Sequence, residues 1–406
     1  MKHCRICKSQ NLQMVLSLGD QPHCNHFLTE EELRLPEARY PLDCFLCNDC
    51  GLLQLGYVVP PEVMFRQYLY ISGTTRTLSQ HFHQLAGQLV EQFALSPDSL
   101  VVDVGSNDGT FLKGFKARRM RVLGVDPAIN IAKMANASGI ETLCDFFGRE
   151  AAARILADKG KARMVTAAGV FYHIPDLDDV VRGVRDLLAD DGVFVVQANY
   201  LVDMLQKNTF DNIYHEHLCY YSLKPLTALF HRFEMEVFDV ERHPIHGGSI
   251  IVYVRKGETS TPKKRVDAML AAERDQGVYS LDTYRAFVER VEQIKDRLVT
   301  MLRDLKAQGK RIAAYGAPAK GNTLLNFCRI GPDVLDYAIE KNDLKVGRYT
   351  PGMHIPVVSE EDAGRAPVDY HLVLPWNFLE EFLEKERGFR TNGGKFIVPV
   401  PMPYII

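Results

Sequence analysis

The middle of the chain alternates short apolar runs with longer, more polar segments. The apolar runs predict strands at 101–104, 121–125, 164–170 and 193–197, and residues 250–254 alternate like a further strand. Strands that alternate with helical segments are typical of a parallel sheet with crossover helices. The pattern therefore predicts an α/β domain in the middle of the chain.

A second block of the same kind follows near the C-terminus. A long helix is predicted from about residue 281, because apolar side chains recur there at steps of three and four, and Gly309 supplies a stop. Four strands are predicted beyond it, at 311–315, 336–339, 370–374 and 396–400. The strand, glycine turn and helix start at 311–323 resemble half of a Rossmann fold, so a second α/β domain is expected.

The length agrees with more than one core. At 406 residues the chain is longer than an ordinary single domain. We expect an N-terminal domain at 1–75, the central α/β domain at 76–257 and a C-terminal domain at 258–406, with a polar linker around 259–264.

Composition argues against two classes of partner. The formal net charge is −3, with 46% hydrophobic and 24% charged residues, as in an ordinary globular protein. Nucleic-acid binding is not expected, because it usually needs a clustered basic face. No stretch approaches the roughly 20 apolar residues that span a bilayer, and no signal-peptide pattern opens the chain. We therefore expect no membrane partner and a cytoplasmic location.

The nine cysteines include two Cys-x-x-Cys pairs, Cys4 with Cys7 and Cys47 with Cys50. Each short turn can present two thiolates to one ion, so the pairs together predict a tetrahedral zinc site with a structural role. Cys44 lies three residues before Cys47 and could replace one ligand. The alternative is a set of reduced thiols packed in a core, but such thiols would rarely form two pairs of this spacing.

A glycine-bearing turn follows the first strand of the central domain. It is predicted to hold a small ligand through Asp103, Gly105, Asn107, Asp108 and Gly109. Glycine lets the main chain approach a ligand, and a helix start presents free N–H groups. The three-glycine spacing of a dinucleotide site is absent, and Asp108 would repel a diphosphate. The turn predicts a nucleoside ligand with hydroxyls and a positive charge; the alternative is an ordinary strand-to-helix turn.

The ends of later strands supply further residues for the same cleft. Asp126 ends the second strand, 23 residues past Asp103, where a carboxylate can accept hydrogen bonds from ribose hydroxyls; a helix N-cap is the alternative. Asp145 and Phe146 follow the next short strand and are expected to meet an adenine. His173 follows the fourth strand and is expected to face the cleft, with a structural hydrogen bond as the alternative.

The segment 208–222 is the most chemically dense, with two histidines, a glutamate and three tyrosines. A protease-like zinc helix is not expected, because His215 and His217 are two residues apart rather than four. Tyr214, Glu216 and His217 suit acid–base chemistry instead. They supply a phenol to bind an enolate oxygen, a carboxylate to orient the histidine and an imidazole to accept a proton.

Two later glycine-bearing segments are candidates for the substrate side. His246 and Gly247 precede a strand, where glycine permits close approach of a substrate, but a β-bulge or tight turn needs the same residues. The turn with Gly316, Lys320 and Asn322 could cradle a phosphate through backbone N–H groups and the lysine; a purely structural turn is the alternative. ATP hydrolysis is not expected, because no Lys-Ser/Thr pair follows the second glycine.

Together these motifs resemble those of class I S-adenosylmethionine methyltransferases, whose cationic sulfonium would explain the acidic turn. Over nearly all 406 residues the chain is similar to the sugar C-methyltransferases that install a branching methyl on nucleotide-linked 4-keto-deoxysugars, as in tetronitrose biosynthesis. The resemblance rests on the Cys-x-x-Cys pairs, the acidic glycine turn, Tyr-His-Glu-His at 214–217, His-Gly-Gly-Ser at 246–249 and the glycine turn at 315–321.

The resemblance implies an α/β fold in three parts. These are a small zinc-binding N-terminal domain, a central Rossmann-like methyltransferase domain and a C-terminal Rossmann-like domain that closes over the sugar nucleotide. The implied cofactors are S-adenosylmethionine and structural Zn²⁺, the implied partner is a nucleotide-linked keto-deoxysugar, and the implied state is a monomer.

The resemblance also implies roles for individual residues. His217 resembles the base that removes the proton next to the ketone, with Tyr214 and Glu216 beside it. His173 and Tyr70 resemble family residues that face the sugar. Tyr68 lies close enough to Tyr70 in the chain to take its place. An O- or N-methyltransferase would share the donor site but need no group for an enolate, so methylation of carbon is favoured. A non-catalytic zinc-ribbon binding protein is the other alternative.

Overall fold

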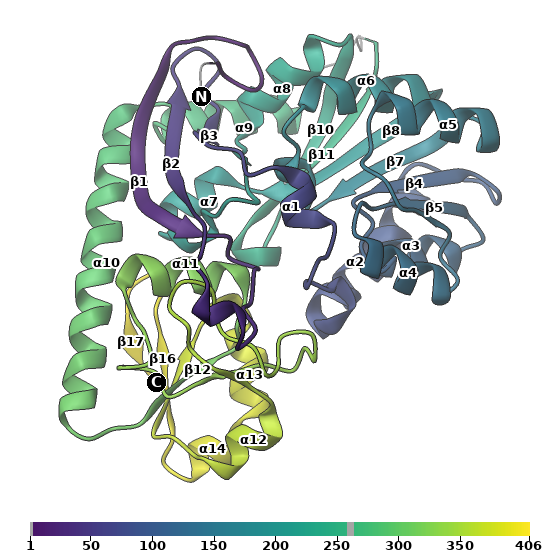
Figure 1. Ribbon diagram of the computed structural model, residues 1–406. Coiled ribbons are helices and arrows are strands. Elements are labelled where there is room, and N and C mark those ends of the chain that lie inside the picture. Colours follow the sequence, from purple (N-terminus) through teal and green to yellow (C-terminus); the bar gives the residue numbers. More distant parts are fainter. Residues whose placement is uncertain (1–2, 258–263) are drawn as a thin grey trace.

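Three β-sheets organise the described part of the chain (Figure 1). The structure, a computed structural model, describes residues 3–257 and 264–406. Residues 259–263 of the expected linker, and the expected domain start at 258, lie outside the described residues. None of the helices in the described part of the chain has the length and apolar character that crossing a bilayer requires.

The central sheet has seven strands in the order β10-β11-β8-β7-β4-β5-β6. Its strands are β4 (Leu100–Val104), β5 (Arg121–Val125), β6 (Thr142–Leu143), β7 (Ala162–Ala168), β8 (Leu188–Asn199), β10 (Met235–His243) and β11 (Ser249–Lys256). The five strands from β8 to β6 are parallel, whereas β11 is antiparallel to both β8 and β10. The predicted parallel α/β arrangement is confirmed, and β10 is a strand that the sequence analysis did not predict.

Helices connect the parallel strands of this sheet and cover it (Figure 1). They are α2 (Arg76–Gln92), which precedes β4, then α3 (Thr110–Lys116), α4 (Ile129–Ala137), α5 (Arg149–Lys159) and α6 (Leu177–Leu187). The short α7 (Leu201–Gln206) and α8 (Leu223–His231) lie between β8 and β10 in the chain. The carboxyl ends of β4, β5 and β7 therefore meet at one edge, where ligands bind in open α/β sheets.

The N-terminal sheet is antiparallel, in the order β1-β2-β3-β9. Its strands are β1 (Leu12–Pro22), β2 (Arg39–Cys47), β3 (Leu53–Leu55) and β9 (Cys219–Tyr220), and α1 (Pro61–Phe65) follows β3. Because β9 comes from the central part of the chain, it ties the segment 214–222 to the N-terminal sheet.

The C-terminal sheet has six strands in the order β14-β13-β12-β15-β16-β17. They are β12 (Ile312–Tyr315), β13 (Ala338–Ile339), β14 (Val357–Val358), β15 (Tyr370–Val373), β16 (Lys395–Val398) and β17 (Tyr404–Ile405). Only β17 runs antiparallel to its neighbour. The helices of this part are α11 (Ala319–Cys328), α12 (Glu360–Arg365), α13 (Leu379–Lys385) and α14 (Arg387–Thr391). The second predicted α/β block is confirmed.

The long helix α10 (Leu281–Ala307) joins the three parts and runs beside β1 down to the C-terminal sheet (Figure 1). It follows α9 (Lys264–Asp275). Ser280 caps its start by accepting a hydrogen bond from the N–H of Asp282, and Gly309 follows its end with a φ of 74°. Its buried stripe is Tyr284, Phe287, Val291, Ile294, Leu298, Leu302 and Leu305. One continuous apolar core includes residues of all three sheets.

Candidate active site

A cavity of about 640 Å³ lies where the three parts of the chain meet. The N-terminal part contributes Asn25, the central part Gly105 and Asp126, and the C-terminal part Gly316 and Lys320. The other predicted site residues that line the cavity are Tyr70, Asn107, Phe146, His173, Tyr214, Glu216, His217 and His246. The fold thus brings residues that are far apart in the chain to one enclosed space.

The turn after β4 forms one wall of the cavity. Gly105 has a φ of 66°, and a Cβ there would lie 2.5 Å from Cγ2 of Val170, so the position requires glycine. Asp126 directly follows β5 and accepts hydrogen bonds from the N–H groups of Asn107 and Ala128, both at 2.9 Å. Burial raises the pKa of Asp126, while these two bonds oppose the rise. This wall, with a glycine cradle and a hydrogen-bonded carboxylate, fits the ribose of a nucleoside such as S-adenosylmethionine.

Three predicted residues stabilise this turn instead of lining the cavity. Asp103 is buried in β4 and accepts a hydrogen bond from the Thr166 hydroxyl at 2.6 Å; burial raises the pKa of Asp103 to about 7. Asp108 accepts hydrogen bonds from the N–H and hydroxyl of Thr110. Gly109, with a φ of 76°, starts α3. These three residues support the turn that carries Gly105 and Asn107.

The side chains of Asp145 and Phe146, which are adjacent in the chain, have different surroundings. Phe146 lines the cavity, and the Arg66 guanidinium lies over its ring at 4.8 Å from the centroid. The Asp145 carboxylate forms an ion pair with Arg154 and accepts the N–H of Phe146. Only Phe146 is therefore presented to a ligand in this arrangement.

His217 is the buried imidazole at the centre of the acid–base group. Its Nδ1–H donates to the carbonyl oxygen of Asn212 at 2.8 Å, so Nε2 is the unprotonated nitrogen of the neutral ring. Burial and the neighbouring His173 lower the pKa of His217 well below its usual value. Its ring packs on those of Tyr214 and Tyr172, with centroid distances of 3.9 and 4.4 Å. A neutral imidazole held in one tautomer can act as a base.

Glu216 is held by groups other than His217. Its carboxylate accepts hydrogen bonds from His23 Nε2 at 3.0 Å, Asn25 Nδ2 at 2.6 Å and the Tyr68 hydroxyl at 2.6 Å. Burial alone would raise the pKa of Glu216, but His23, His173 and the hydrogen bond from Tyr68 lower it to about 2. The structure corrects the expectation that Glu216 orients His217, because the two side chains, although adjacent in the chain, have different partners.

His173 and Tyr70 both line the cavity beside this group. The rings of His173 and His217 are stacked, with 5.2 Å between their centroids. The Nε2 of His173 is buried without a hydrogen-bond partner among the described residues, and burial lowers the pKa of His173 to about 4. Burial raises the pKa of Tyr70 to about 12. Tyr68 lines the cavity too, so both aromatic residues of this segment are available to a substrate.

Lys320 lines the cavity from the first turn of α11, which follows Gly316. Its ammonium lies 3.8 Å from the centroid of the Trp376 ring and donates to Asn377 Oδ1. Burial lowers the pKa of Lys320 to about 8, although the charge of Asp211 opposes this. The Trp376 indole N–H donates to Asp211 Oδ2 at 2.6 Å. The result is a desolvated cation on the cavity wall, which suits an anionic ligand.

The remaining substrate-side candidates have different surroundings. His246 lines the cavity with a left-handed φ of 56°, and burial lowers its pKa to about 4. The carbonyl oxygen of Gly247 accepts a hydrogen bond from Lys207 at 2.6 Å. The side-chain amide of Asn322 donates to the carbonyl oxygen of Cys24 at 2.7 Å. Asn322 thus ties α11 to the segment that holds Glu216.

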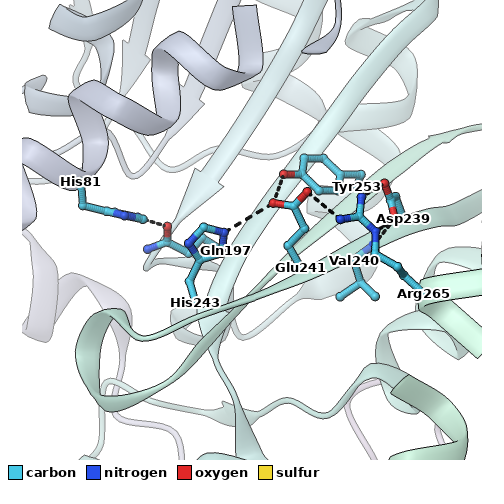
Figure 2. A network of polar contacts seen from close by, with 8 residues as sticks. All are labelled: His81, Gln197, Asp239, Val240, Glu241, His243, Tyr253 and Arg265. Carbon is cyan, nitrogen blue, oxygen red and sulfur yellow. Dashed lines mark hydrogen bonds and ion pairs between the residues drawn. The ribbon is translucent and has the colours of Figure 1, made fainter. Parts of the chain in front are cut away.

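A polar network anchors the strand that leads to His246 (Figure 2). His81 of α2 bonds Gln197 of β8 at 2.7 Å, and the His243 ring contacts Glu241 at 3.5 Å. Arg265 of α9 joins Glu241 and Asp239, and Tyr253 donates to Glu241. These contacts fix the end of β10 directly before the turn at 245–248.

Sequence reasoning missed the partners of the buried carboxylates. Asn25 and Glu216 are 191 positions apart, and Trp376 and Asp211 are 165 positions apart. No local pattern marks such residues, because only the assembled fold brings them together. Glu340 was also missed, although its position directly after β13 is the same signal that identified Asp126 after β5.

The four predicted zinc ligands converge at the start of the N-terminal sheet. The Sγ atoms of Cys4 and Cys50 are 3.5 Å apart, as are those of Cys7 and Cys47, and all four lie within 4.8 Å of one another. Tetrahedral Zn–S bonds of about 2.3 Å place sulfurs about 3.8 Å apart, so this set fits one zinc ion. Cys44 lies outside the group, and burial raises the pKa of its thiol.

Comparison with known proteins agrees with this anatomy. Family models match three successive parts of the chain: a zinc binding domain at residues 4–65, a methyltransferase domain at 78–240 and a C-methyltransferase C-terminal domain at 244–401. The C-methyltransferase NovU of Streptomyces niveus is 39% identical over 404 residues, which cover 99% of this chain and 96% of NovU.

Several solved methyltransferase structures align with less than half of the chain. The S-adenosylmethionine-dependent methyltransferase from Anabaena variabilis is 16% identical with a TM-score of 0.36, over 44% of this chain and 85% of its own. The magnesium protoporphyrin IX methyltransferase from Synechocystis is 13% identical with a TM-score of 0.34, over 44% of this chain and 79% of its own. The assignment rests on the family models and NovU: the chain belongs to the C-methyltransferase family, as an S-adenosylmethionine-dependent enzyme with a zinc-binding N-terminal domain.

Proposed function

We propose that the chain methylates the carbon next to the ketone of a nucleotide-linked 4-keto-deoxysugar. The observation that carries this proposal is the neutral His217 imidazole, whose Nδ1–H is engaged by Asn212 in the same cavity that Asp126 lines. Methylation of a carbon next to a ketone requires a base to remove its proton and a methyl donor bound nearby, and this cavity holds both His217 and a carboxylate placed to bind a ribose.

The donor side would be held by the β4 turn. Asp126 accepts hydrogen bonds from the ribose hydroxyls, and the main chain of Gly105 and Asn107 lies against the ligand. Phe146 packs against its adenine. Asp103, Asp108 and Gly109 support the turn from behind. S-adenosylmethionine supplies an electrophilic methyl group on a cationic sulfur, and the ionised Glu216 adds negative charge to the same cavity.

Proton removal falls to His217. Its Nε2 accepts the proton from the carbon next to the ketone, because burial keeps the imidazole neutral. The C–H electron pair moves toward the carbonyl oxygen and forms an enolate. The enolate carbon then attacks the methyl group of S-adenosylmethionine, so that a C–C bond forms, the bond from sulfur to the methyl breaks and S-adenosylhomocysteine leaves. Positioned general bases contribute about 10²–10⁴-fold to such steps.

The enolate oxygen needs a donor, and Tyr214 supplies it. Burial and the charge of Glu216 raise the pKa of the Tyr214 phenol well above its usual value, so the phenol stays protonated and can donate. His173 and Tyr70 contact the sugar beside this group, and His246 also lines the cavity that holds it. Glu216 acts by holding Tyr68, His23 and Asn25 in place rather than by orienting His217.

The nucleotide would extend toward the C-terminal domain. Gly316 and Lys320 contact the diphosphate, whose charge favours the ammonium form of the desolvated lysine. Asn322 and Gly247 hold the neighbouring segments. The monomeric state that the resemblance implies is part of this proposal.

The product tests this proposal directly. The enzyme is incubated with S-adenosylmethionine labelled with ¹³C in its methyl group and a panel of nucleotide-linked 4-keto-deoxysugars. Mass spectrometry finds the methylated product, and carbon NMR shows whether the label is bonded to carbon or oxygen. A methyl on the carbon next to the ketone is expected. An O-methyl product, or no product from any member of the panel, would contradict the proposal.

A further inference from the structure

The C-terminal domain repeats the construction of the donor site. In the central sheet, β4 lies between β7 and β5, and in the C-terminal sheet, β12 lies between β15 and β13; both sets are parallel. In each set a short 3₁₀ helix begins three residues after the end of one outer strand. It is Phe171–His173 after β7 and Trp376–Phe378 after β15.

The two turns agree in their main-chain contacts. Gly105 directly follows β4 and donates its N–H to Val125 at 2.8 Å; Gly316 directly follows β12 and donates its N–H to Ile339 at 2.9 Å. Both glycines have left-handed φ angles, 66° and 81°. A Cβ on Gly316 would lie 2.8 Å from Pro375, which occupies the same place after β15 as Val170 does after β7.

The carboxylates agree as well. Asp126 follows β5 and Glu340 follows β13, and each donates its own N–H to the outer neighbouring strand. Each accepts one N–H from the glycine turn, Asn107 at 2.9 Å and Ala317 at 3.3 Å. Each also accepts the N–H of the residue two positions on, at 2.9 Å for Asp126 and 3.2 Å for Glu340.

The two turns carry opposite charges and therefore favour ligands of opposite charge. The donor turn carries Asp108, which favours a cationic ligand. The C-terminal turn has Ala319 and Lys320 in the corresponding stretch at the start of its helix, which favours an anionic one. Glu340 and Lys320 line the same cavity, so the repeated site presents a carboxylate and a cation to one ligand.

We propose that Glu340 accepts hydrogen bonds from the ribose hydroxyls of the substrate nucleoside, as Asp126 does for the methyl donor. The inference rests on the proposed nucleotide-linked substrate and adds the residue that binds the ribose of its nucleoside. The Glu340 side chain is 13% exposed, toward the cavity it lines. Lys345 lies 3.7 Å from Glu340 Oε2 but donates to the Ala317 carbonyl at 2.9 Å. Among the described residues this oxygen therefore has only long contacts, and it can accept a hydrogen bond from a ligand hydroxyl.

Calorimetry on the full chain tests this assignment. The dissociation constants of the 5′-diphosphates of uridine, thymidine, cytidine, adenosine and guanosine are measured first, and the tightest is carried forward with its 3′-deoxy analogue. Both are then titrated into the wild type, Glu340→Gln and Glu360→Gln. Glu360 is the matched control, because it is another cavity-lining glutamate of the same domain, paired with Lys385.

Glu340→Gln is expected to weaken the nucleoside diphosphate at least about tenfold and its 3′-deoxy analogue less than about twofold, because a charged hydrogen bond is lost only where the hydroxyl exists. Glu360→Gln is expected to bind both nucleotides as the wild type does. The affinity for S-adenosylhomocysteine is expected to be unchanged in both variants. Equal weakening of both nucleotides, or equal effects of the two glutamine variants, would overturn the assignment. If no nucleoside diphosphate binds the wild type, the proposed nucleotide-linked substrate fails instead.

Discussion

The Nδ1–H of His217 donates to the carbonyl oxygen of Asn212 at 2.8 Å, and this bond decides which nitrogen of the ring is basic. A carbonyl oxygen can only accept, so the neutral ring carries its proton on Nδ1 and its lone pair on Nε2. Because burial lowers the pKa of His217, this form persists below pH 6.5. The carbonyl oxygen of Asn212 therefore leaves the Nε2 lone pair of His217 free for the proposed role as a base.

Replacing the base should separate chemistry from donor binding. His217→Asn is expected to lower the rate of methylation by about 10²–10⁴-fold, the usual contribution of a positioned base. The dissociation constant for S-adenosylhomocysteine, measured by calorimetry, should change less than twofold. His215→Asn is the matched control, since His215 is also buried and bonds a backbone carbonyl, that of Tyr40. Comparable rate losses in both variants would contradict the assignment.

Glu216 should make the stability of the fold depend on pH. Its pKa is about 2 in the folded chain against an ordinary value of 4.5. A lowered folded-state pKa means that the ionised group stabilises the fold above pH 4.5, and that this contribution is lost as the pH falls from about 4.5 to about 2. The shift corresponds to about 3 kcal/mol.

Glu216→Gln is therefore expected to lower the free energy of unfolding by up to about 3 kcal/mol at pH 7. The variant should also lose less stability than the wild type between pH 5 and pH 3. Urea denaturation across this range measures both effects. Parallel pH dependences in the two proteins would show that Glu216 is not the titrating group.

Donor affinity should depend on Asp126 more than on Asp145. Asp126→Asn is expected to weaken S-adenosylhomocysteine at least about tenfold, because it removes a charged acceptor from the ribose hydroxyls. Asp145→Asn should have little effect, since its carboxylate is paired with Arg154. Calorimetry on both variants gives the comparison, and the reverse order of effects would restore the predicted contact of Asp145 with the adenine.

Metal content should follow the four clustered thiols. The purified chain is expected to hold about one zinc ion, and Cys47→Ser should lose it and unfold at a lower temperature. Cys44→Ala is the matched control, because Cys44 lies on the same strand but outside the cluster. Metal analysis under reducing conditions decides, and zinc loss from the Cys44 variant alone would move the ligand assignment.

Patterns along the chain predicted the buried parallel strands better than the partly exposed antiparallel strands. The apolar runs at β4, β5, β7, β8 and β12 are buried strands, and such runs signal themselves. The hairpin of β1 and β2 mixes exposed and buried positions and was missed, as was β10 with its acidic residues. Such partly exposed strands depend on their neighbours more than on their own composition, both at a sheet edge, as in β1 and β10, and inside a sheet, as in β2.

The candidate site divides in the same way. Asp126, Gly105 and the four cysteines were found because strand ends and short spacings are local signals. The partners of Glu216 were not found, because His23, Asn25 and Tyr68 reach it only through tertiary packing. Adjacency in the chain suggested that Glu216 would orient His217, whereas the fold gives that position to a backbone carbonyl.

Solvent exchange tests the central claim most directly, because it isolates proton removal from methyl transfer. The enzyme is incubated in heavy water with S-adenosylhomocysteine and the keto-sugar nucleotide that it methylates, and proton NMR follows the C–H next to the ketone. Loss of that signal with the wild type, and its retention with His217→Asn, is the predicted result. An unchanged signal with the wild type, or equal loss with both proteins, would contradict carbon methylation through His217.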